Sequence, residues 1–118
     1  MATKSKLKLI QQSTHYLKVR QDRVPPFIME GSYVFAEKVE ANAISLKPDI
    51  FLVSFLNGGK RFIKGQRKNG NLLFSDIRSG RAVPSYKNEI NGIYRLKLVS
   101  DTEVDIPVHL KSLHDQIS

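Results

Sequence analysis

Few side chains in this sequence have a setting that suggests chemistry, and Arg23 has the most constrained one. It lies in the stretch "QDRVPPFIMEGSYVF", residues 21–35, just before a double proline that leads into a run of β-branched and aromatic residues. Proline fixes its own backbone angle φ and cannot donate to a sheet, so Pro25 and Pro26 predict a tight corner before a strand. Such a corner would hold the Arg23 side chain at a fixed place on the surface.

The densest run of positive charge follows later, between Lys60 and Arg81, where seven basic residues accompany one acid, Asp76, and two phenylalanines, Phe62 and Phe74. The basic residues are Lys60, Arg61, Lys64, Arg67, Lys68, Arg78 and Arg81. A basic strip with accessible aromatic rings binds nucleic acid through phosphate contacts and base stacking. A solvated hairpin with both phenylalanines in the core explains the same pattern, and we favour that interpretation.

Motifs for metal binding, phosphate binding and nucleophilic catalysis are missing from the sequence. The histidines His15, His109 and His114 lack the i, i+4 spacing that places two metal ligands on one face of a helix. Glycine-rich phosphate loops and the Gly-x-Ser-x-Gly nucleophile turn do not occur. We therefore expect no metal site and no cofactor.

Length and composition narrow the class of protein. The chain has 118 residues, 41% hydrophobic and 25% charged, which is typical of one globular domain spanning residues 1–118. It has no cysteine, which excludes disulfides and thiolate nucleophiles and favours a cytoplasmic location. The longest apolar runs are far shorter than the roughly 20 residues of a membrane span, and no secretory signal is recognisable. The net charge of +8 favours polyanions without implying sequence-specific binding.

The middle of the chain is expected to be mostly strand. Asn-Gly pairs beginning at residues 57, 69 and 91 separate apolar runs and predict hairpin turns, because both residues tolerate positive φ. Alternation in the last run predicts that Tyr94, Leu96 and Leu98 face one side of the sheet, and that Arg95, Lys97 and Val99 face the other. The expected strands cover residues 16–20, 32–39, 49–56, 60–66, 71–76 and 92–100. The predicted fold class is mainly β, built as a strand meander and hairpins.

The two ends of the chain are expected to differ from this middle part. Residues 1–14 form an N-terminal arm in which lysines alternate with apolar residues, as in an extended strand; a frayed helical turn is the alternative. The stretch "DTEVD", residues 101–105, predicts a solvated face of an edge strand. The segment 107–118 has Leu110, Leu113 and Ile117 at i, i+3 and i+7, which predicts a short C-terminal helix.

Five segments follow one another in a recognisable order: "LKVRQDRVPPFIMEGSYVFAEKVE", "LKPDIFLVSF", "RFIKG", "GNLLFSD" and "EINGIYRLKLV". This order, from about Tyr16 to Val99, resembles the C-terminal domain of the LexA, UmuD and phage CI repressor family. The resemblance implies a LexA-like peptidase fold, self-association as a dimer and a role in transcription regulation by a phage-type repressor. It also implies that any contact with DNA is made through an upstream helix-turn-helix domain that this chain does not contain.

Within this resemblance, Asp22 and Pro26 stand at the family's aspartate and proline, and Lys64 stands at the lysine that acts as general base. Arg23, however, stands at the position of the serine nucleophile, and Gly65 stands where an arginine usually follows the lysine. A guanidinium stays protonated and has no nucleophilic lone pair, so a Ser-Lys mechanism cannot run through this position. The resemblance therefore implies a catalytically inactive domain that works by self-association or by binding another protein.

Two further functions stay open at the level of the sequence. The first is a nucleic-acid-binding β-domain that uses the basic hairpin Lys60–Arg81. The second is a Ser-Lys self-cleaving peptidase that recruits another serine, such as Ser32 or Ser75.

Overall fold

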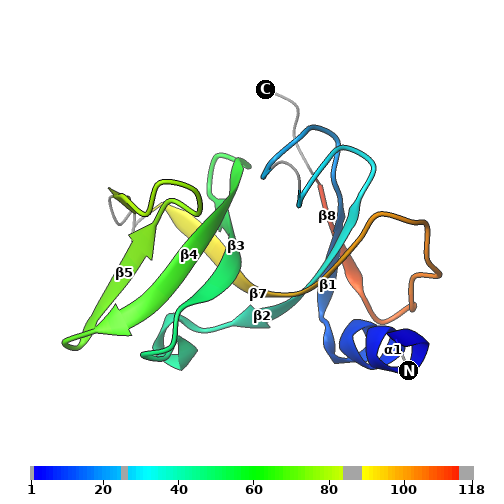
Figure 1. Ribbon diagram of the computed structural model, residues 1–118, viewed down its shortest axis with the longest axis horizontal. Helices are drawn as coiled ribbons and strands as arrows, with labels where there is room; N and C mark the ends of the chain where they lie inside the picture. Colours follow the sequence, from blue (N-terminus) through cyan, green and yellow to red (C-terminus); the bar gives the residue numbers. More distant parts are fainter. Residues whose placement is uncertain (1, 25–26, 84–88, 115–118) are drawn as a thin grey trace.

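The computed structural model describes residues 2–24, 27–83 and 89–114, and within them the chain forms one bent, mixed sheet of eight strands (Figure 1). The strands are β1 (His15–Lys18), β2 (Tyr33–Val39), β3 (Asp49–Phe55), β4 (Lys60–Lys68), β5 (Asn71–Ser75), β6 (Ala82–Val83), β7 (Ile90–Ser100) and β8 (Lys111–Leu113). A helix, α1 (Ala2–Gln12), and a 3-10 turn, η1 (Ala41–Ala43), are the other elements of this part. The mainly β fold class is confirmed.

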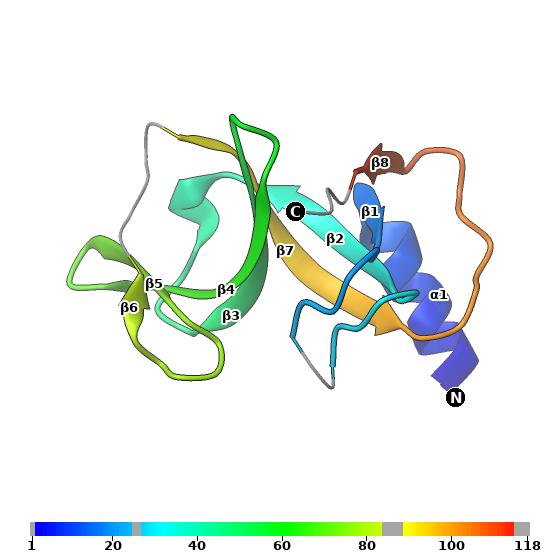
Figure 2. The ribbon, with the colours of Figure 1, turned by 90° about the horizontal axis from the view of Figure 1, so that it is seen from above.

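The order of strands across the sheet is β6-β5-β4-β3-β7-β2-β1-β8. All neighbours in this order run antiparallel except β1 and β8, which are parallel. The long strand β7 pairs with β3 from Ile90 to Arg95 and with β2 from Ile93 to Ser100. It therefore joins the half of the sheet that contains β3, β4 and β5 to the half that contains β1, β2 and β8 (Figure 2).

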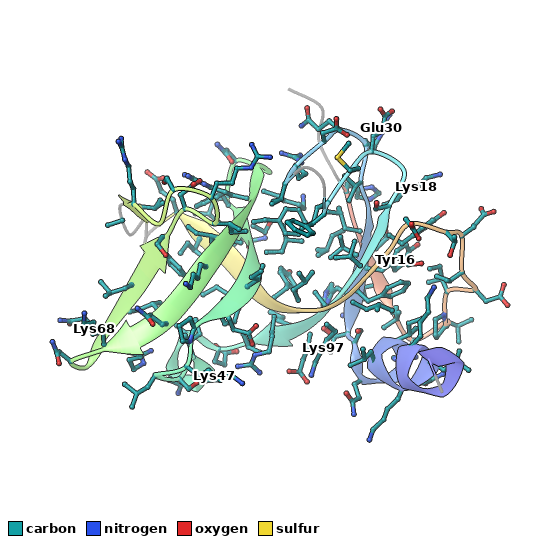
Figure 3. The ribbon with its side chains drawn as sticks, viewed as in Figure 1. Tyr16, Lys18, Glu30, Lys47, Lys68 and Lys97 are labelled. Atoms are coloured by element: carbon teal, nitrogen blue, oxygen red, sulfur yellow. The ribbon has the colours of Figure 1, made fainter. Side chains whose placement is uncertain are left out.

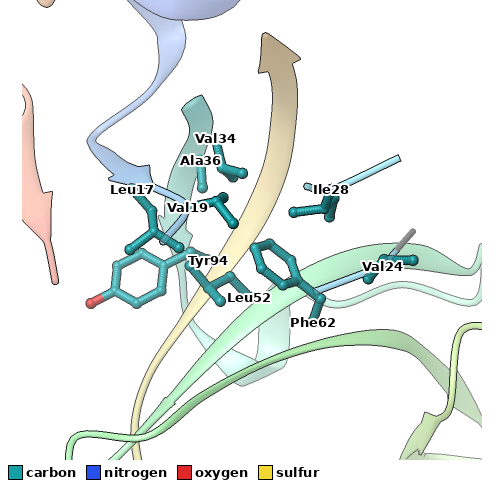
Figure 4. Close-up of a cluster of buried hydrophobic side chains, with 9 residues drawn as sticks. All are labelled: Leu17, Val19, Val24, Ile28, Val34, Ala36, Leu52, Phe62 and Tyr94. Atoms are coloured by element: carbon teal, nitrogen blue, oxygen red, sulfur yellow. The ribbon is translucent and has the colours of Figure 1, made fainter. Parts of the chain in front are cut away.

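Apolar side chains are buried on both faces of the bent sheet. Within the described chain they form three clusters. The central cluster lies inside the bend and consists of Leu17, Val19, Val24, Ile28, Val34, Ala36, Leu52, Phe62 and Tyr94 (Figure 4). The second cluster is built around Phe51 and Phe74, and the third joins Ile10 of α1 to Phe35 and Leu110. Each buried side chain of this size stabilises the fold by roughly 1.5–3 kcal/mol relative to exposure.

Two of the three Asn-Gly pairs form the predicted hairpin turns. Asn69 and Gly70 both have positive φ, 53° and 79°, and connect β4 to β5; Gly58, with φ of 88°, lies in the turn from β3 to β4. The third prediction is wrong, because Asn91 and Gly92 lie inside β7. Gly92 is buried there, and a Cβ atom on it would lie 2.8 Å from the Tyr94 hydroxyl oxygen, so this glycine serves close packing.

The predicted alternation along β7 holds only up to Leu96. Phe35 of β2 pairs with Leu98, but the next residue, Ala36, pairs with Leu96, so Lys97 is an extra residue in β7. A bulge of this kind moves the following side chains to the opposite face. Leu98 accordingly packs in the third cluster, whereas Val99 packs against the central cluster.

Both ends of the chain differ from what the sequence predicted. The N-terminal arm is the helix α1 rather than an extended strand, and Lys6 Nζ ties it to β7 by donating to Ser100 Oγ at 2.9 Å. The predicted C-terminal helix is wrong for residues 107–114, which form a turn and the short strand β8. Residues 101–105 form an exposed loop rather than a strand, except for the half-buried Val104.

The correction at the C-terminus has a physical reason. A helix of the length expected at the C-terminus is marginal by itself, whereas β8 finds hydrogen-bond partners on β1. The amide of Lys111 donates to the carbonyl of Thr14 at 3.1 Å, next to that pairing. The corner at Pro25 and Pro26 and the last residues of the predicted helix, 115–118, lie outside the described residues.

Gly65 has a packing role that explains why no larger residue stands beside Lys64. A Cβ atom at position 65 would lie 2.9 Å from Cδ2 of Phe51 and 3.3 Å from Cε1 of Phe74. Both rings are buried in the second cluster, so they have little room to move. The glycine is what allows β4 to lie this close to the two rings.

We predict that Gly65→Ala lowers the free energy of unfolding by about 1–3 kcal/mol, the usual cost of overpacking a core. The exposed neighbour provides the control, since Lys64→Ala should change stability by no more than about 0.5 kcal/mol. Urea denaturation of the three proteins measures both values. Equal stability of Gly65→Ala and the wild type would show that the aromatic rings move aside at no cost.

Candidate functional site

Arg23 lies in a short backbone clamp that fixes its position. The amides of Arg23 and Val24 both donate to the carbonyl of Ile28, at 2.8 and 3.0 Å, and the amide of Ile28 donates to the carbonyl of Val24 at 2.8 Å. Val24 and Ile28 are buried in the central cluster, and the Asp22 carboxylate accepts a hydrogen bond from the amide of Glu30 at 2.9 Å. The segment is therefore held from inside by apolar packing and from outside by Asp22.

A hollow of about 160 Å³ opens beside this clamp, and we refer to it as the Arg23 hollow. Three segments contribute to it: the clamp, the start of β4, and the loop that follows β5. Its apolar lining consists of Val24, Phe62 and Ile77, which belong to or pack against the central cluster. Its charged lining consists of Arg23, Lys60, Arg61, Arg78 and Asp76. Four cationic side chains thus surround one carboxylate.

Asp76 is held in its ionised form by the loop that it begins. Hydrogen bonds from the backbone and the hydroxyl of Ser79, followed by the backbone of Arg78 and the charge of Arg61, lower the pKa of the Asp76 carboxyl below its usual value. The amide of Ser79 donates to Oδ2 at 2.8 Å, and Arg61 Nη2 lies 3.8 Å from Oδ1. The carboxylate therefore keeps its charge at neutral pH and offsets part of the positive charge of the Arg23 hollow.

Lys64 does not line the Arg23 hollow. It lies on exposed surface in an adjoining depression of about 410 Å³, together with Pro48, Asp49 and Ile50, and only Ile77 lines both hollows. Among the described residues that line the two hollows, none carries a hydroxyl or thiol. The two positions that the family resemblance pairs therefore face neighbouring spaces, without a nucleophile in either.

The two serines considered as replacements have different settings. Ser32 is buried, and its carbonyl accepts a hydrogen bond from the amide of Val19 at 2.8 Å. Ser75 is directly opposite Lys64 in the pairing of β4 with β5, so the two residues are cross-strand neighbours. A lysine acts as a general base only where burial favours its neutral form, and Lys64 is exposed. The Lys64–Ser75 pair therefore lacks the desolvation that this chemistry requires.

The structure divides the basic residues between the two faces of β4. Side chains alternate between the two faces of a strand, so Lys60, Phe62, Lys64 and Lys68 belong to one face of β4. Ile63, Gly65 and Arg67 belong to the other face. Phe62 and Phe74 are both buried in core clusters and cannot stack on bases. Arg78 and Arg81 lie exposed in the loop after β5. The seven cations are thus a dispersed set, and the Arg23 hollow gathers only three of them.

Arg67 has a structural role that the sequence did not reveal. Its guanidinium donates to three carbonyls: that of Ile44 at 3.2 Å, that of Ala41 at 2.6 Å and that of Gly70 at 3.3 Å. The first two belong to the segment around η1, and the third belongs to the turn between β4 and β5. Arg67 therefore fastens η1 to the β4–β5 hairpin.

His15 has a different setting from the other two histidines. His15 packs edge to face against Tyr94, with ring centroids 4.7 Å apart, and its Nδ1 is 2.8 Å from Thr14 Oγ1. Desolvation, and then the charges of Lys38 and Lys111, lower the pKa of His15, which favours the neutral ring. His109 and His114 are exposed. The described residues contain no group of three or more histidine or acidic side chains arranged to hold a metal ion.

Sequence reasoning named Asp76 and Phe62 within the basic stretch, but it did not place the acidic and apolar residues of the Arg23 hollow beside Arg23. Asp76 and Ile77 belong to "SDIRSG", where an aspartate followed by serine and glycine is typical of a side-chain-capped turn. Gly80, with φ of 72°, completes this turn by donating to the carbonyl of Asp76 at 2.9 Å. The turn signal was therefore present, but nothing in the sequence placed it beside Arg23.

Comparisons with known proteins do not assign the chain to a family. No family model, curated protein or solved structure matches it. Within the described part of the chain, no helix has the length and apolarity that a membrane span requires.

We predict that Arg67→Lys lowers the free energy of unfolding by about 1–3 kcal/mol, because an ammonium group cannot replace three directed donors of a planar guanidinium. Chemical denaturation measures the change. Lys68→Gln, at the next position and exposed, is the control and should stay within about 0.5 kcal/mol of the wild type. If Arg67→Lys and Lys68→Gln had the same small effect, the three carbonyl contacts would contribute nothing to stability.

Proposed function

We propose that this chain is a catalytically inactive interaction domain of the LexA-like repressor type, and that it works by self-association. The order of the segments between Tyr16 and Val99 supports the relationship. In such a repressor, a separate DNA-binding domain would contact the operator, and this domain would hold two copies together.

The observation that carries the proposal is the setting of Arg23. The position expected to hold the nucleophile carries a guanidinium that lines a hollow with Lys60, Arg61 and Arg78. No hydroxyl or thiol lines this hollow within the described chain, and Lys64 is exposed in the adjoining depression. A surface of this composition can bind another molecule, but it has no group that attacks a peptide carbonyl.

The ends of the described sheet provide a route to self-association. β6 and β8 are its outermost strands, with two and three residues, and an outermost strand leaves backbone groups on one side without a ladder partner. Exposed apolar side chains lie next to them, namely the fully exposed Val108 before β8 and the 40% exposed Leu73 on β5. A second copy could therefore add to the sheet by pairing with β8.

The alternative of a nucleic-acid-binding domain has less support. Phe62 and Phe74 are buried, and the donors of Arg67 are engaged with backbone carbonyls. A sequence-independent attraction to nucleic acid still follows from the net charge of +8, and salt should weaken it strongly.

We predict that the chain forms at least a population of dimers at micromolar concentration, because self-association is the proposed function. Sedimentation velocity over a dilution series, which separates monomer from dimer by mass and shape, measures the equilibrium. A strictly monomeric mass up to several hundred micromolar would contradict the proposed function.

We also predict that the purified chain does not cleave itself. Incubation for a day at about pH 10, close to the ordinary pKa of lysine, raises the fraction of neutral lysine and should leave the intact mass unchanged. Mass spectrometry checks this result. A fragment that ends at one defined bond, and that disappears in Lys64→Ala or Ser75→Ala, would instead establish a dyad formed by these two residues.

A further inference from the structure

The Arg23 hollow has the composition of a site for an anionic side chain. Arg23, Lys60, Arg61 and Arg78 reach it from three separate segments, so the fold itself collects these charges. Asp76 is the single acid in the lining, and Val24, Phe62 and Ile77 provide an apolar surface beside the charges. Arginine forks bind carboxylates with two parallel hydrogen bonds, and the methylene groups of an acidic residue suit an apolar wall.

We propose that this hollow binds a carboxylate from the segment 101–106 of a second copy of the chain. The proposal rests on the self-association proposed above and names a contact for it other than strand pairing at β8. The segment reads "DTEVDI", and its three carboxylates, those of Asp101, Glu103 and Asp105, are exposed. Val104 and Ile106 pack against the third cluster, which anchors the loop. Its acidic side chains are exposed, and those of Glu103 and Asp105 line an open hollow beside α1 together with Lys6.

The position of this loop requires that the contact is made between two copies. The loop follows β7 and lies beside α1, whereas the Arg23 hollow is lined by the start of β4 and the loop after β5 (Figure 1). In Figure 1 the orange loop lies at the opposite end of the molecule from β4 and β5. Two copies that exchange this contact reciprocally form a closed dimer, because each provides one hollow and one loop.

A peptide carboxylate fits the hollow better than a nucleic-acid backbone. A space of about 160 Å³ lined by four cations accepts a carboxylate with a few methylene groups. Asp76 in the hollow and Asp49 in the adjoining depression would repel a continuous chain of phosphates, while an isolated carboxylate can avoid them. The described lining also provides no exposed aromatic ring for base stacking.

Charge reversal tests the contact. One double variant, Arg61→Glu with Arg78→Glu, makes the hollow acidic; the other, Glu103→Lys with Asp105→Lys, makes the loop basic. Each variant alone should dimerise at least about tenfold more weakly than the wild type, because both contacts of its dimer become repulsive. An equimolar mixture of the two should regain an affinity close to that of the wild type, since both contacts of the mixed dimer are again attractive.

The matched control reverses the same number of charges elsewhere. Lys47 and Lys68 are exposed and lie near the end of β4 that is farthest from Lys60 (Figure 3). The variant Lys47→Glu with Lys68→Glu has the same net charge as the hollow variant and should dimerise like the wild type. Circular dichroism melts of all variants show whether each one is folded.

A direct probe keeps the proposal testable if a variant fails to fold. A synthetic peptide of residues 101–108 is titrated into dilute wild-type protein, and backbone amide NMR shifts should move at Val24, Arg61, Phe62 and Ile77. The same peptide with its three acids changed to the matching amides should cause no shift. Raised salt should weaken the binding, as expected for exposed charges.

The outcomes separate this contact from the proposed function. If the wild type dimerises and both charge-reversed variants dimerise equally well, the contact is wrong while self-association stands. If the wild type stays monomeric at several hundred micromolar, the dimer contact is wrong together with the proposed function. An oligonucleotide that shifts the same amides more tightly than the peptide would also overturn the assignment of the hollow to a carboxylate.

Discussion

The fold depends on β7, because this strand carries the bend between the two halves of the sheet. Over the short span from Ile93 to Arg95 it pairs with β2 and β3 at the same time. Arg95 reinforces the junction from its side chain: its Nη1 lies 3.4 Å from a carboxylate oxygen of Glu37 on β2, and its Nε lies 3.3 Å from one of Asp49 on β3. Its guanidinium also lies over the ring of Phe51. A half-buried network of this kind is screened less than a surface pair, so it helps to hold the register of three strands.

This junction determines where the charges of the candidate site meet. Tyr94 of β7 and Leu52 of β3 lie in the central cluster, inside the bend, and the clamp around Arg23 closes over the same cluster through Val24 and Ile28. Phe62 belongs to this cluster too, so the start of β4 is drawn toward the clamp. Charged side chains therefore line the Arg23 hollow at the edge of a packed apolar core. Its cations come together because apolar residues next to them are buried, and the favourable burial outweighs their repulsion.

The sequence predicted most strands correctly, but it predicted the two ends of the chain and the candidate site less well. The physical reasons can be traced to particular residues. The strands β1 to β5 and β7 were visible because their apolar runs and two Asn-Gly turns are local signals, whereas the two-residue strand β6 was not predicted. Leu98 was assigned to the wrong face because Lys97 forms a bulge whose cause is the pairing with β2, not the local pattern. The segment after Pro107 was wrongly predicted to be a helix, because the stretch with helical spacing is short. The strand with which it pairs, β1, is distant in the sequence. The basic stretch was visible, but only the fold could show that Arg67 binds carbonyls while Arg61 lines a hollow with Arg23.

The arginine at position 23 changes what the surrounding surface can do. A serine beside a lysine needs a dry setting in which the lysine loses its charge, and such a setting would penalise a second cation severely. The Arg23 hollow is open enough for four cations, and Asp76 lies among them with a lowered pKa that keeps it ionised. Lys64, exposed in the adjoining depression, adds to the positive charge of this side of the sheet. An arginine at the position that the family resemblance gives to a nucleophile is thus consistent with the rest of the site. A cationic binding surface requires hydration and a nearby carboxylate, and a dry catalytic dyad excludes both.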